Sequence, residues 1–427
     1  MSDMLDVIGI GFGPANIALA IALEELESPL TIKFFEKNKT ATWQNEMLLD
    51  NSDIQNHPLR DLVTPRNPRS RYSFTNFLFE NNRLFEHLNL GLLFPLRVEY
   101  QQYVTWVASF FEKLVKYDTA IVNIEAIIKN SQLEGYQVTD DKGQQWQAKA
   151  IVMAPGRTPN IPEEFKQVND PRIIHFTKYL TALNDLITCK SSPKVAVIGG
   201  SQTSVELLLD LANKCTDIDI TGISRNFGFR QKDTSPFSDE VYFPSFVDLF
   251  FNADQTKKQK LRSELQTSNY SSTDIDVLEQ LYVKIYQDKI LNRKTINLKF
   301  NTDIKEVIAN SEGINLTLAN NITEKNEQNS FDLVILATGF LDLGLGSKCE
   351  LYPPLCKSLV EQLGIANQVL TINYDYRVNL PKSFMNNHPI YLNGLCESSH
   401  GMGDAGSFSL LALRSKAIVE SLEKNLI

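Results

Sequence analysis

Two stretches of the 427-residue chain show the most regular hydrophobic pattern, and each predicts a strand, a glycine-rich turn and a helix. Residues 5–8 form an apolar run typical of a buried strand, and residues 17–26 continue with the apolar spacing of a helix. Residues 195–198 predict a second buried strand, which a helix starting near Gln202 follows. The pattern therefore predicts two strand–turn–helix units, the basis of an α/β fold.

The first turn has the residues of a dinucleotide site. Gly9, Gly11 and Gly13, followed by Pro14, let the backbone turn tightly and approach a pyrophosphate at the helix N-terminus. Glu36 ends the next predicted strand, where its carboxylate can accept a hydrogen bond from an adenosine ribose. The alternative is a purely structural turn, which the strand, the helix and the distal acid disfavour together.

The second turn differs from the first in two ways. Gly199 and Gly200 make the turn, but Ser201 replaces the middle glycine, and the following strand ends in Arg225 where an acid is usual. A guanidinium at that place suits a 2′-phosphate and favours NADPH over NADH, the alternative being that Arg225 simply lies on the surface. Two nucleotide sites in one chain imply a flavoenzyme that a nicotinamide reduces.

The order of these units predicts the domain organisation. We expect two Rossmann-like domains and a small, mainly helical substrate region, and an exposed hairpin over residues 309–330. The expected ranges are 1–165 and 338–427 for the FAD domain, 190–337 for the NADPH domain, and 233–288 for the substrate region.

Composition narrows the possible partners. The net charge of −9, without a block of basic residues, argues against nucleic acid or an anionic membrane. The first residues lack the basic start of a signal peptide, and the glycines of the first turn exclude a membrane-spanning helix. Five cysteines without metal or redox spacing favour a reducing cytoplasm. No metal site is expected, because His57, His175 and His400 lie on separate loops.

Seven segments between and around the turns are similar to the signature blocks of the lysine/ornithine N-monooxygenase family. They are residues 43–47, 54–64, 68–74, 94–100, 233–242, 267–270 and 400–404, in the order of that family. The resemblance implies an enzyme that uses FAD, NADPH and O2 to hydroxylate a terminal primary amine through a C4a-hydroperoxyflavin, usually for hydroxamate siderophores. It also implies a homo-oligomer, either a tetramer or a dimer.

The resemblance also implies roles for single residues. Gln55 lies against the flavin, and Asn269 touches both the nicotinamide and the reacting amine, so these two are the expected catalytic residues. Ser409 holds the far end of the substrate. Besides the residues of the two turns, Glu36, Gln55, Arg225 and Asn269, the expected cofactor-binding residues are Trp43, Val122, Ser201, Gln202, Ser204, Ser271, Gly406, Ser407 and Phe408.

Two departures from the family pattern bear on the substrate. Arg60 replaces a lysine that binds the α-carboxylate, and Asp239 replaces an asparagine. Arg60 would still hold a carboxylate, but Asp239 would repel one, at a cost of about 4 kcal/mol for two anions ~4 Å apart. We therefore expect a diamine such as putrescine or cadaverine, whose second ammonium binds Asp239.

Other interpretations stay open at this point. Arg60 and Asp239 could pair with each other, or Asp239 could hold the α-amino group of L-lysine or L-ornithine. More distant alternatives are a related flavin monooxygenase that acts on a ketone or a sulfide, and a flavoprotein without catalytic activity.

Overall fold

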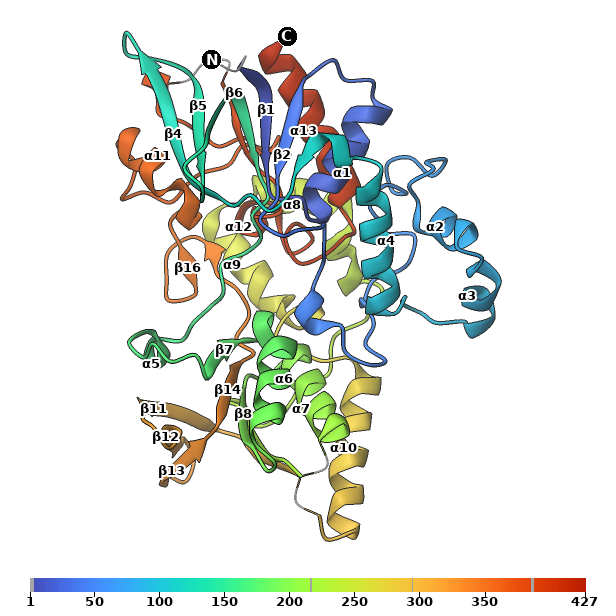
Figure 1. Cartoon of the computed structure of the whole chain (residues 1–427), viewed down its shortest axis with the longest axis vertical. Coiled ribbons are helices and arrows are strands. Elements are labelled where there is room, and N and C mark those ends of the chain that lie inside the picture. The colour runs from blue at the N-terminus through green and yellow to red at the C-terminus, as the bar shows by residue number, and fades with distance from the viewer. Residues whose placement is uncertain (1–3, 216, 294, 385–387) are drawn as a thin grey trace.

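The computed structural model describes residues 4–215, 217–293, 295–384 and 388–427. Residues 1–3, which begin both the expected first domain and the segment expected to lack a signal peptide, lie outside the described residues. The chain forms two main sheets, the first in the upper half of Figure 1 and the second in the lower half. The expected α/β class with two Rossmann-type sheets is confirmed.

The first sheet is built around the first glycine-rich unit, and its order is β3-β2-β1-β6-β5-β4, with β17 also paired to β6. Its strands are β1 (Leu5–Ile10), β2 (Ile32–Phe35), β3 (Val115–Lys116), β4 (Ile121–Lys129), β5 (Gln132–Asp140), β6 (Gln145–Met153) and β17 (Ile390–Leu392). The central strands are parallel and almost entirely buried, as a sheet covered on both faces requires. Residues 390–392 therefore complete a sheet that the N-terminal part begins.

Helices from both ends of the sequence cover the first sheet. The helix α1 (Pro14–Glu25) packs against α13 (Leu411–Leu426), and both lie on the same side of the sheet in Figure 1. Further helices of this half are α2 (Phe74–Glu80), α3 (Leu84–Leu90), α4 (Arg97–Ser109) and α11 (Lys357–Gln362). One hydrophobic core joins all these elements.

The second sheet is parallel throughout and has the order β10-β9-β8-β14-β7. Its strands are β7 (Ile173–His175), β8 (Lys194–Ile198), β9 (Asp219–Ile223), β10 (Ile296–Lys299) and β14 (Leu333–Leu336). The helices α6 (Tyr179–Cys189), α7 (Gln202–Lys214) and α10 (Ile275–Ile290) pack with it in one core. The strand β7 precedes residue 190, so the second sheet begins earlier in the sequence than the expected domain range.

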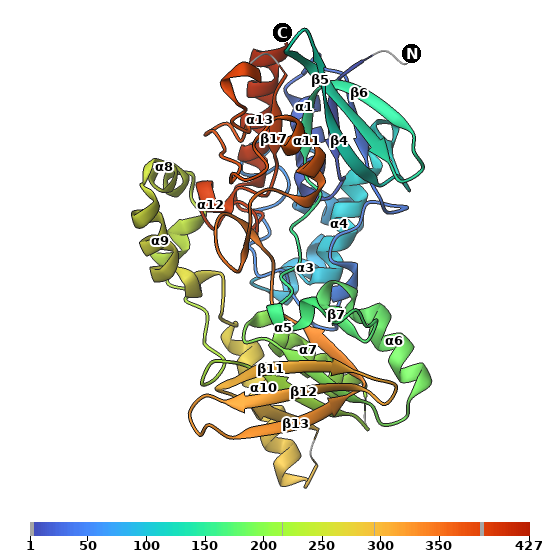
Figure 2. The ribbon, with the colours of Figure 1, turned by 90° about the vertical axis from the view of Figure 1, so that its left-hand side faces the viewer.

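A three-stranded antiparallel sheet covers the other face of the second sheet (Figure 2). It consists of β11 (Thr302–Ala309), β12 (Ile314–Asn320) and β13 (Asn326–Phe331). Ile314, Leu316 and Leu318 are fully buried and pack with Ala196 and Val334 of the second sheet. The expectation of an exposed hairpin over residues 309–330 is therefore wrong for β12, because every second side chain of that strand faces a core.

The remaining segments lie between the two halves. The helices α8 (Pro244–Asn252) and α9 (Gln255–Glu264) lie beside α12 (Glu397–His400), as Figure 2 shows, and α8 contacts α12. The short strands β15 (Asp342–Leu343) and β16 (Cys349–Glu350) follow the return of the chain to the first half. Within the described residues no helix combines the length and apolar character needed to cross a membrane.

A buried ion pair joins the two halves. Arg97, at the start of α4, donates through Nη2 to Glu206 Oε1 of α7 at 2.9 Å, and through Nη1 to the Met47 carbonyl at 2.8 Å. Arg97 is 6% exposed and Glu206 is 7% exposed. Because both charges are out of water, each depends on the other.

We predict that Glu206→Ala lowers the free energy of unfolding by about 3–5 kcal/mol, because it leaves the Arg97 guanidinium buried without its carboxylate. Urea unfolding followed by circular dichroism measures the change. The double variant Arg97→Met/Glu206→Met should recover most of the loss, and Glu420→Ala, which removes an exposed partner of Lys416, should cost under about 1 kcal/mol. A loss of that small size for Glu206→Ala would contradict the prediction.

Candidate active site

The first glycine-rich turn leaves open space at the start of α1. Gly11 has a φ of +81°, and a Cβ there would lie 2.3 Å from the Ala154 carbonyl oxygen, so only glycine fits. A Cβ on Gly13 would meet no atom within 4 Å, and no side chain caps the helix. Free backbone N–H groups facing open space fit the pyrophosphate of FAD, with Pro14 at the first position of the helix.

Glu36 lies against this turn, as a ribose-binding acid requires. Its Oε2 accepts a hydrogen bond from the Phe12 amide at 2.8 Å, and its Oε1 accepts one from the Asn38 amide at 2.9 Å. A carboxylate offers about four lone-pair sites, so two remain for a ribose hydroxyl. Val122, expected near the adenine, lies on β4 with 55% of its surface exposed.

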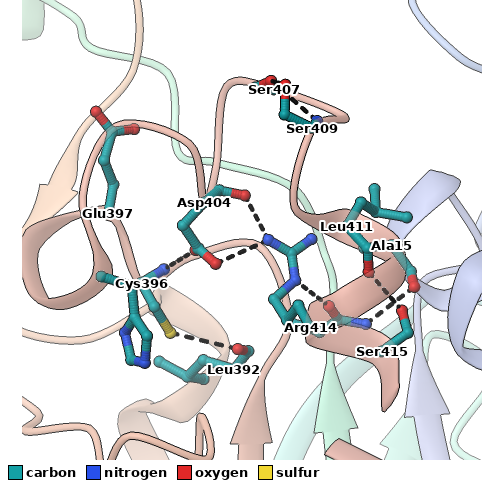
Figure 3. Close-up of polar contacts among 12 residues, drawn as sticks. Ala15, Leu392, Cys396, Glu397, Asp404, Ser407, Ser409, Leu411, Arg414 and Ser415 are labelled. Carbon is teal, nitrogen blue, oxygen red and sulfur yellow. Dashed lines mark hydrogen bonds and ion pairs between the residues drawn. The ribbon is translucent and has the colours of Figure 1, made fainter. Parts of the chain in front are cut away.

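A buried polar network fixes the loop expected over the flavin ring. Arg414 Nη1 lies 2.8 Å from Asp404 Oδ1, Asp404 Oδ2 accepts from the Cys396 amide at 2.6 Å, and both charged residues are 2% exposed (Figure 3). Arg414 also donates to Asn393, whose Nδ2 donates to the Ala15 carbonyl at 3.0 Å. The loop over residues 404–408, which we call the flavin loop, is thereby tied to the start of α1.

The two expected catalytic residues both have an unsatisfied amide. Gln55 Nε2 and Asn269 Nδ2 are buried and have no hydrogen-bond partner among the described residues. Gln55 also adopts a left-handed φ of +51°, and its backbone N–H donates to the Asp53 carboxylate. A buried amide without a partner is costly, so these two groups fit a bound ligand, and Gln55 stores backbone strain of the kind found at functional sites.

Gly406 marks the point where the flavin loop meets Asn269. A Cβ on Gly406 would lie 3.1 Å from Asn269 Nδ2 and 3.1 Å from the Tyr270 hydroxyl. Next to it, Phe408 is 8% exposed and packs edge-on against Trp43 and Tyr100, with ring centroids 5.2 Å and 4.9 Å away. The rings of Phe408 and Trp43 thus form part of the core beneath the loop.

The expected substrate residues gather around Tyr242. The Arg60 guanidinium lies 5.7 Å from the centroid of the Tyr242 ring, and the Tyr242 hydroxyl donates to the Ser268 carbonyl, one residue before Asn269. Burial raises the pKa of Tyr242 most, and the negative charge of Asp239 raises it further. In the described part of the chain no ion pair joins Arg60 to Asp239, so both charges remain available to a substrate.

Ser409 belongs to the same group of residues. Its hydroxyl lies 2.8 Å from the Ser407 hydroxyl and 3.4 Å from Asn56 Oδ1, while Asn56 Nδ2 donates to the Arg60 carbonyl. Ser409 is therefore linked to the backbone of Arg60 through one side chain.

The second glycine-rich turn has the geometry of a nucleotide site as well. A Cβ on Gly199 would lie 2.5 Å from the Ala337 carbonyl oxygen, and Ser201 precedes α7 without a side-chain cap. Arg225 follows β9 and is exposed. The backbone N–H of Gln202 donates to the Ser272 carbonyl at 2.9 Å and that of Ser204 donates to the Ser201 carbonyl at 2.9 Å, so these two are not open to a phosphate. The exposed Arg225 guanidinium beside this turn fits the 2′-phosphate of a nicotinamide dinucleotide.

Three expected NADPH residues already bond to protein groups. The Gln202 side chain donates to Glu206 at 3.0 Å and accepts from the Asp274 amide at 2.8 Å. Ser204 donates to the Ser201 carbonyl, and Ser271 accepts from Gln266. Gln202 therefore joins α7 to the segment that carries Asn269 and Ser271.

The three histidines considered at first lie apart. His175 Nε2 lies 2.9 Å from the Gly339 carbonyl oxygen, His400 Nε2 lies 3.1 Å from the Tyr374 carbonyl oxygen, and His57 is exposed. Among the described residues, no group of three or more His, Cys, Asp or Glu side chains could hold a metal ion.

Sequence reasoning missed a partly buried charged cluster beside Gly406, which we call the junction cluster. Its members are Arg157, Arg262, Tyr270, Asp342 and Glu397. Arg157 Nη2 lies 2.6 Å from Asp342 Oδ1, Arg262 also pairs with Asp342, and the Tyr270 hydroxyl donates to Glu397 Oε2 at 2.6 Å. Arg157 follows β6, where the chain leaves the first sheet, and Asp342 follows β14, where the chain returns to the first half. Their positions beside these two passages were the signal in the sequence that could have pointed to the cluster.

The chain is similar to known proteins over most of its length. A family model described as L-lysine 6-monooxygenase/L-ornithine 5-monooxygenase matches residues 3–342. The chain is 33% identical to an L-ornithine N(5)-monooxygenase of Pseudomonas aeruginosa, over 99% of this chain and 94% of that protein.

Two solved structures are also similar over 99% of each chain. The first is an ornithine N-hydroxylase of Kutzneria sp. 744 described with reduced FAD, NADP+ and L-ornithine, with a TM-score of 0.88 and 28% identity. The second is an L-lysine 6-monooxygenase of Pseudomonas syringae, with a TM-score of 0.86 and 32% identity.

The junction cluster predicts a pH-dependent stability. Burial raises the pKa of Glu397 to about 7 from its ordinary 4.5, so the folded protein binds this proton more tightly than the unfolded chain does. The free energy of unfolding should therefore fall as pH rises from about 4.5 to 7, with a contribution from Glu397 of about 3 kcal/mol.

Thermal unfolding at several pH values measures this dependence. Glu397→Gln should flatten it and leave the Tm nearly unchanged at the acidic end, where Glu397 is neutral. The exposed Glu361→Gln should leave the pH dependence as it is. The same slope in Glu397→Gln as in the unmodified protein would show that Glu397 does not titrate in this range.

Proposed function

Because the chain belongs to the L-lysine 6-monooxygenase/L-ornithine 5-monooxygenase family, we propose that it hydroxylates the side-chain amine of L-ornithine or L-lysine. It is a flavin-dependent N-hydroxylating monooxygenase, and we assign FAD, NADPH and O2 to it. The observation that carries the proposal is the meeting of unpartnered Asn269 with Gly406, close to Arg60, Asp239 and Ser409. The product would serve hydroxamate siderophore synthesis.

The charges around Tyr242 support an amino acid as substrate. An α-amino acid carries a carboxylate and an ammonium on one carbon atom, and Arg60 and Asp239 supply one partner for each. The repulsion expected between Asp239 and a carboxylate does not arise if Asp239 holds the ammonium and Arg60 holds the carboxylate. Ser409 can then donate a hydrogen bond to the same head group.

A diamine fits these two charges less well. Its second ammonium would find Asp239 but would also face the Arg60 guanidinium, which has no ion-pair partner within the described residues. The curated relative and the structures above act on ornithine or lysine by their descriptions. The diamine reading expected from the sequence therefore becomes the second candidate, favoured only by Asp239.

The chain's own residues position the substrate and exclude water. Bound FAD, reduced by NADPH, supplies the activated oxygen. The Asn269 amide orients the neutral amine, the open start of α1 holds the pyrophosphate, and Gln55 donates toward the flavin. The Arg414–Asp404 pair keeps the loop over residues 404–408 closed against α1, so the reacting amine is held away from bulk water.

Two expectations about the protein in the cell stay predictions. All five cysteines are described and free, which supports a reducing cytoplasm. The homo-oligomer, as a tetramer or dimer, rests on the family resemblance alone.

We predict coupled hydroxylamine formation and NADPH oxidation with L-ornithine or L-lysine, and slower, uncoupled oxidation with putrescine, cadaverine and 1,3-diaminopropane. Arg60→Gln should raise the KM for the amino acid roughly 10- to 100-fold, because a charge-assisted bond of about 1.5–3 kcal/mol is lost. Asp239→Asn should raise it too. Coupled turnover of a diamine, with a KM that Asp239→Asn raises and Arg60→Gln lowers, would establish the second candidate instead.

We also predict that Arg225 selects NADPH. Arg225→Gln should raise the KM for NADPH roughly 10- to 100-fold and leave the KM for NADH unchanged, since only NADPH carries the 2′-phosphate. Arg69→Gln, an exposed arginine of the first half, is the matched control. Equal effects on both nucleotides would mean that Arg225 does not contact the 2′-phosphate.

A further inference from the structure

The junction cluster places a buried carboxylate one hydrogen bond away from the reaction site. Glu397 is 2% exposed, its Oε2 accepts from the Tyr270 hydroxyl at 2.6 Å, and its Oε1 is buried without a hydrogen-bond partner among the described residues. The Tyr270 hydroxyl and Asn269 Nδ2 both lie 3.1 Å from the point where a Cβ of Gly406 would be. Tyr270 thus bridges Glu397 and the place where Asn269 meets the flavin loop.

The substrate amine requires a proton acceptor at that place. A primary amine with an ordinary pKa near that of lysine, ~10.4, arrives as an ammonium at neutral pH, and only the neutral amine has a lone pair that can attack oxygen. Asn269 Nδ2 is buried, so an amine that it orients is not in contact with bulk water. An acceptor inside the protein must therefore lie within one or two hydrogen bonds of Asn269.

We propose that Glu397, acting through the Tyr270 hydroxyl, accepts the proton that the substrate ammonium must lose before N-hydroxylation. The inference rests on the proposed function and adds a proton path to it. One N–H bond of the ammonium breaks, and its electron pair stays on nitrogen. The Tyr270 oxygen takes that proton while its own proton passes to Glu397 Oε2. The net change is ammonium to amine and carboxylate to carboxylic acid.

The charges around Glu397 suit this role. Arg157 Nη1 lies 3.6 Å from Glu397 Oε2 and donates to the Tyr270 hydroxyl at 3.1 Å, while Asp342 faces Glu397 from β15 and Arg262 faces it from α9. The negative charge of Glu397 also raises the pKa of the nearby Tyr242. Burial, opposed by these arginines, brings the pKa of Glu397 to about 7, close to that of an efficient base at neutral pH.

Two other ionisable side chains near the flavin loop are less suited to accept the proton. Asp404 is paired with Arg414 and the Cys396 amide, and Figure 3 shows the Glu397 carboxylate pointing away from that pair. Burial raises the pKa of Tyr270 well above its ordinary value, so its hydroxyl passes a proton on and does not remain ionised. Glu397 is thus the acceptor that the geometry provides.

The first experiment compares the pH dependence of kcat/KM for the amine in the FAD-loaded enzyme at saturating NADPH. In the unmodified enzyme kcat/KM should rise as a group with a pKa near 7 loses its proton. Glu397→Gln should lower kcat/KM roughly 100-fold above that pH and remove the rise. Tyr270→Phe should give a similar loss, and the double variant should lose little more, because both residues act in one path.

The matched control is Glu350→Gln. Glu350 is half-buried, its Oε1 accepts from the Thr158 hydroxyl, and it lines a small cavity together with Arg157 and Asp342, but it does not reach Tyr270. This variant should keep the pH profile of the unmodified enzyme. Anaerobic reduction of the flavin by NADPH should proceed at the same rate in all these variants, because hydride transfer needs no amine proton.

A second readout does not depend on turnover. Infrared spectra of the resting protein should show a carboxylic acid carbonyl band that disappears as pH passes through about 7, and Glu397→Gln should lack it. The variant assigns the band to Glu397, because burial also raises the pKa of Asp53, to about 6.

The outcomes separate the inference from the proposed function. If the unmodified enzyme forms hydroxylamine but Glu397→Gln keeps its rate and pH profile, or the band is absent, the proton path is overturned and the N-hydroxylase assignment stands. If the unmodified enzyme forms no hydroxylamine from any amine, the proposed function itself fails.

Discussion

The site depends on the partly buried ion pair between Arg157 and Asp342. Arg157 follows β6, where the chain leaves the first sheet, and Asp342 lies where it returns, so one pair at 2.6 Å holds both passages together. Arg262 joins the same carboxylate from α9, and Tyr270 joins Arg157 from the segment that carries Asn269. Through these contacts, the position of Asn269 relative to the flavin loop is linked to the contact between the two halves of the molecule.

The two glycine-rich turns use the same backbone geometry for different tasks. In both, a carbonyl oxygen of a neighbouring strand end approaches the turn so closely that a side chain is excluded, at Gly11 by Ala154 and at Gly199 by Ala337. What differs is the residue after the next strand. Glu36 is buried against the first turn, whereas Arg225 is exposed beside the second. A buried carboxylate suits a hydroxyl of a resident cofactor, and an exposed guanidinium suits the phosphate of a nucleotide that must exchange during turnover.

Arg60 and Asp239 show how far a substitution can be interpreted without its surroundings. Taken singly, an aspartate in place of an asparagine repels a carboxylate, and that argument leads to a diamine. In the structure both residues lie around Tyr242 without pairing with each other, and together they match the two charges of an amino acid head group. The proposed substrate changes to an amino acid because its head group would meet both charges at once.

The sequence by itself determined both nucleotide units, since their strands, turns and helices depend on neighbouring residues, and the structure places them at β1–α1 and β8–α7. Through the resemblance it also predicted Gln55, Asn269 and Gly406 as site residues, which stay predictions. It could not show that β12 is buried on one face, because an alternating strand with polar neighbours looks the same on a surface as over a core. Nor could it find Glu397 or Arg157, which lie far from Tyr270 in sequence. Their pairing, and the burial that shifts the pKa of Glu397, arise only when distant segments fold against each other and exclude water, so the tertiary structure alone decided them.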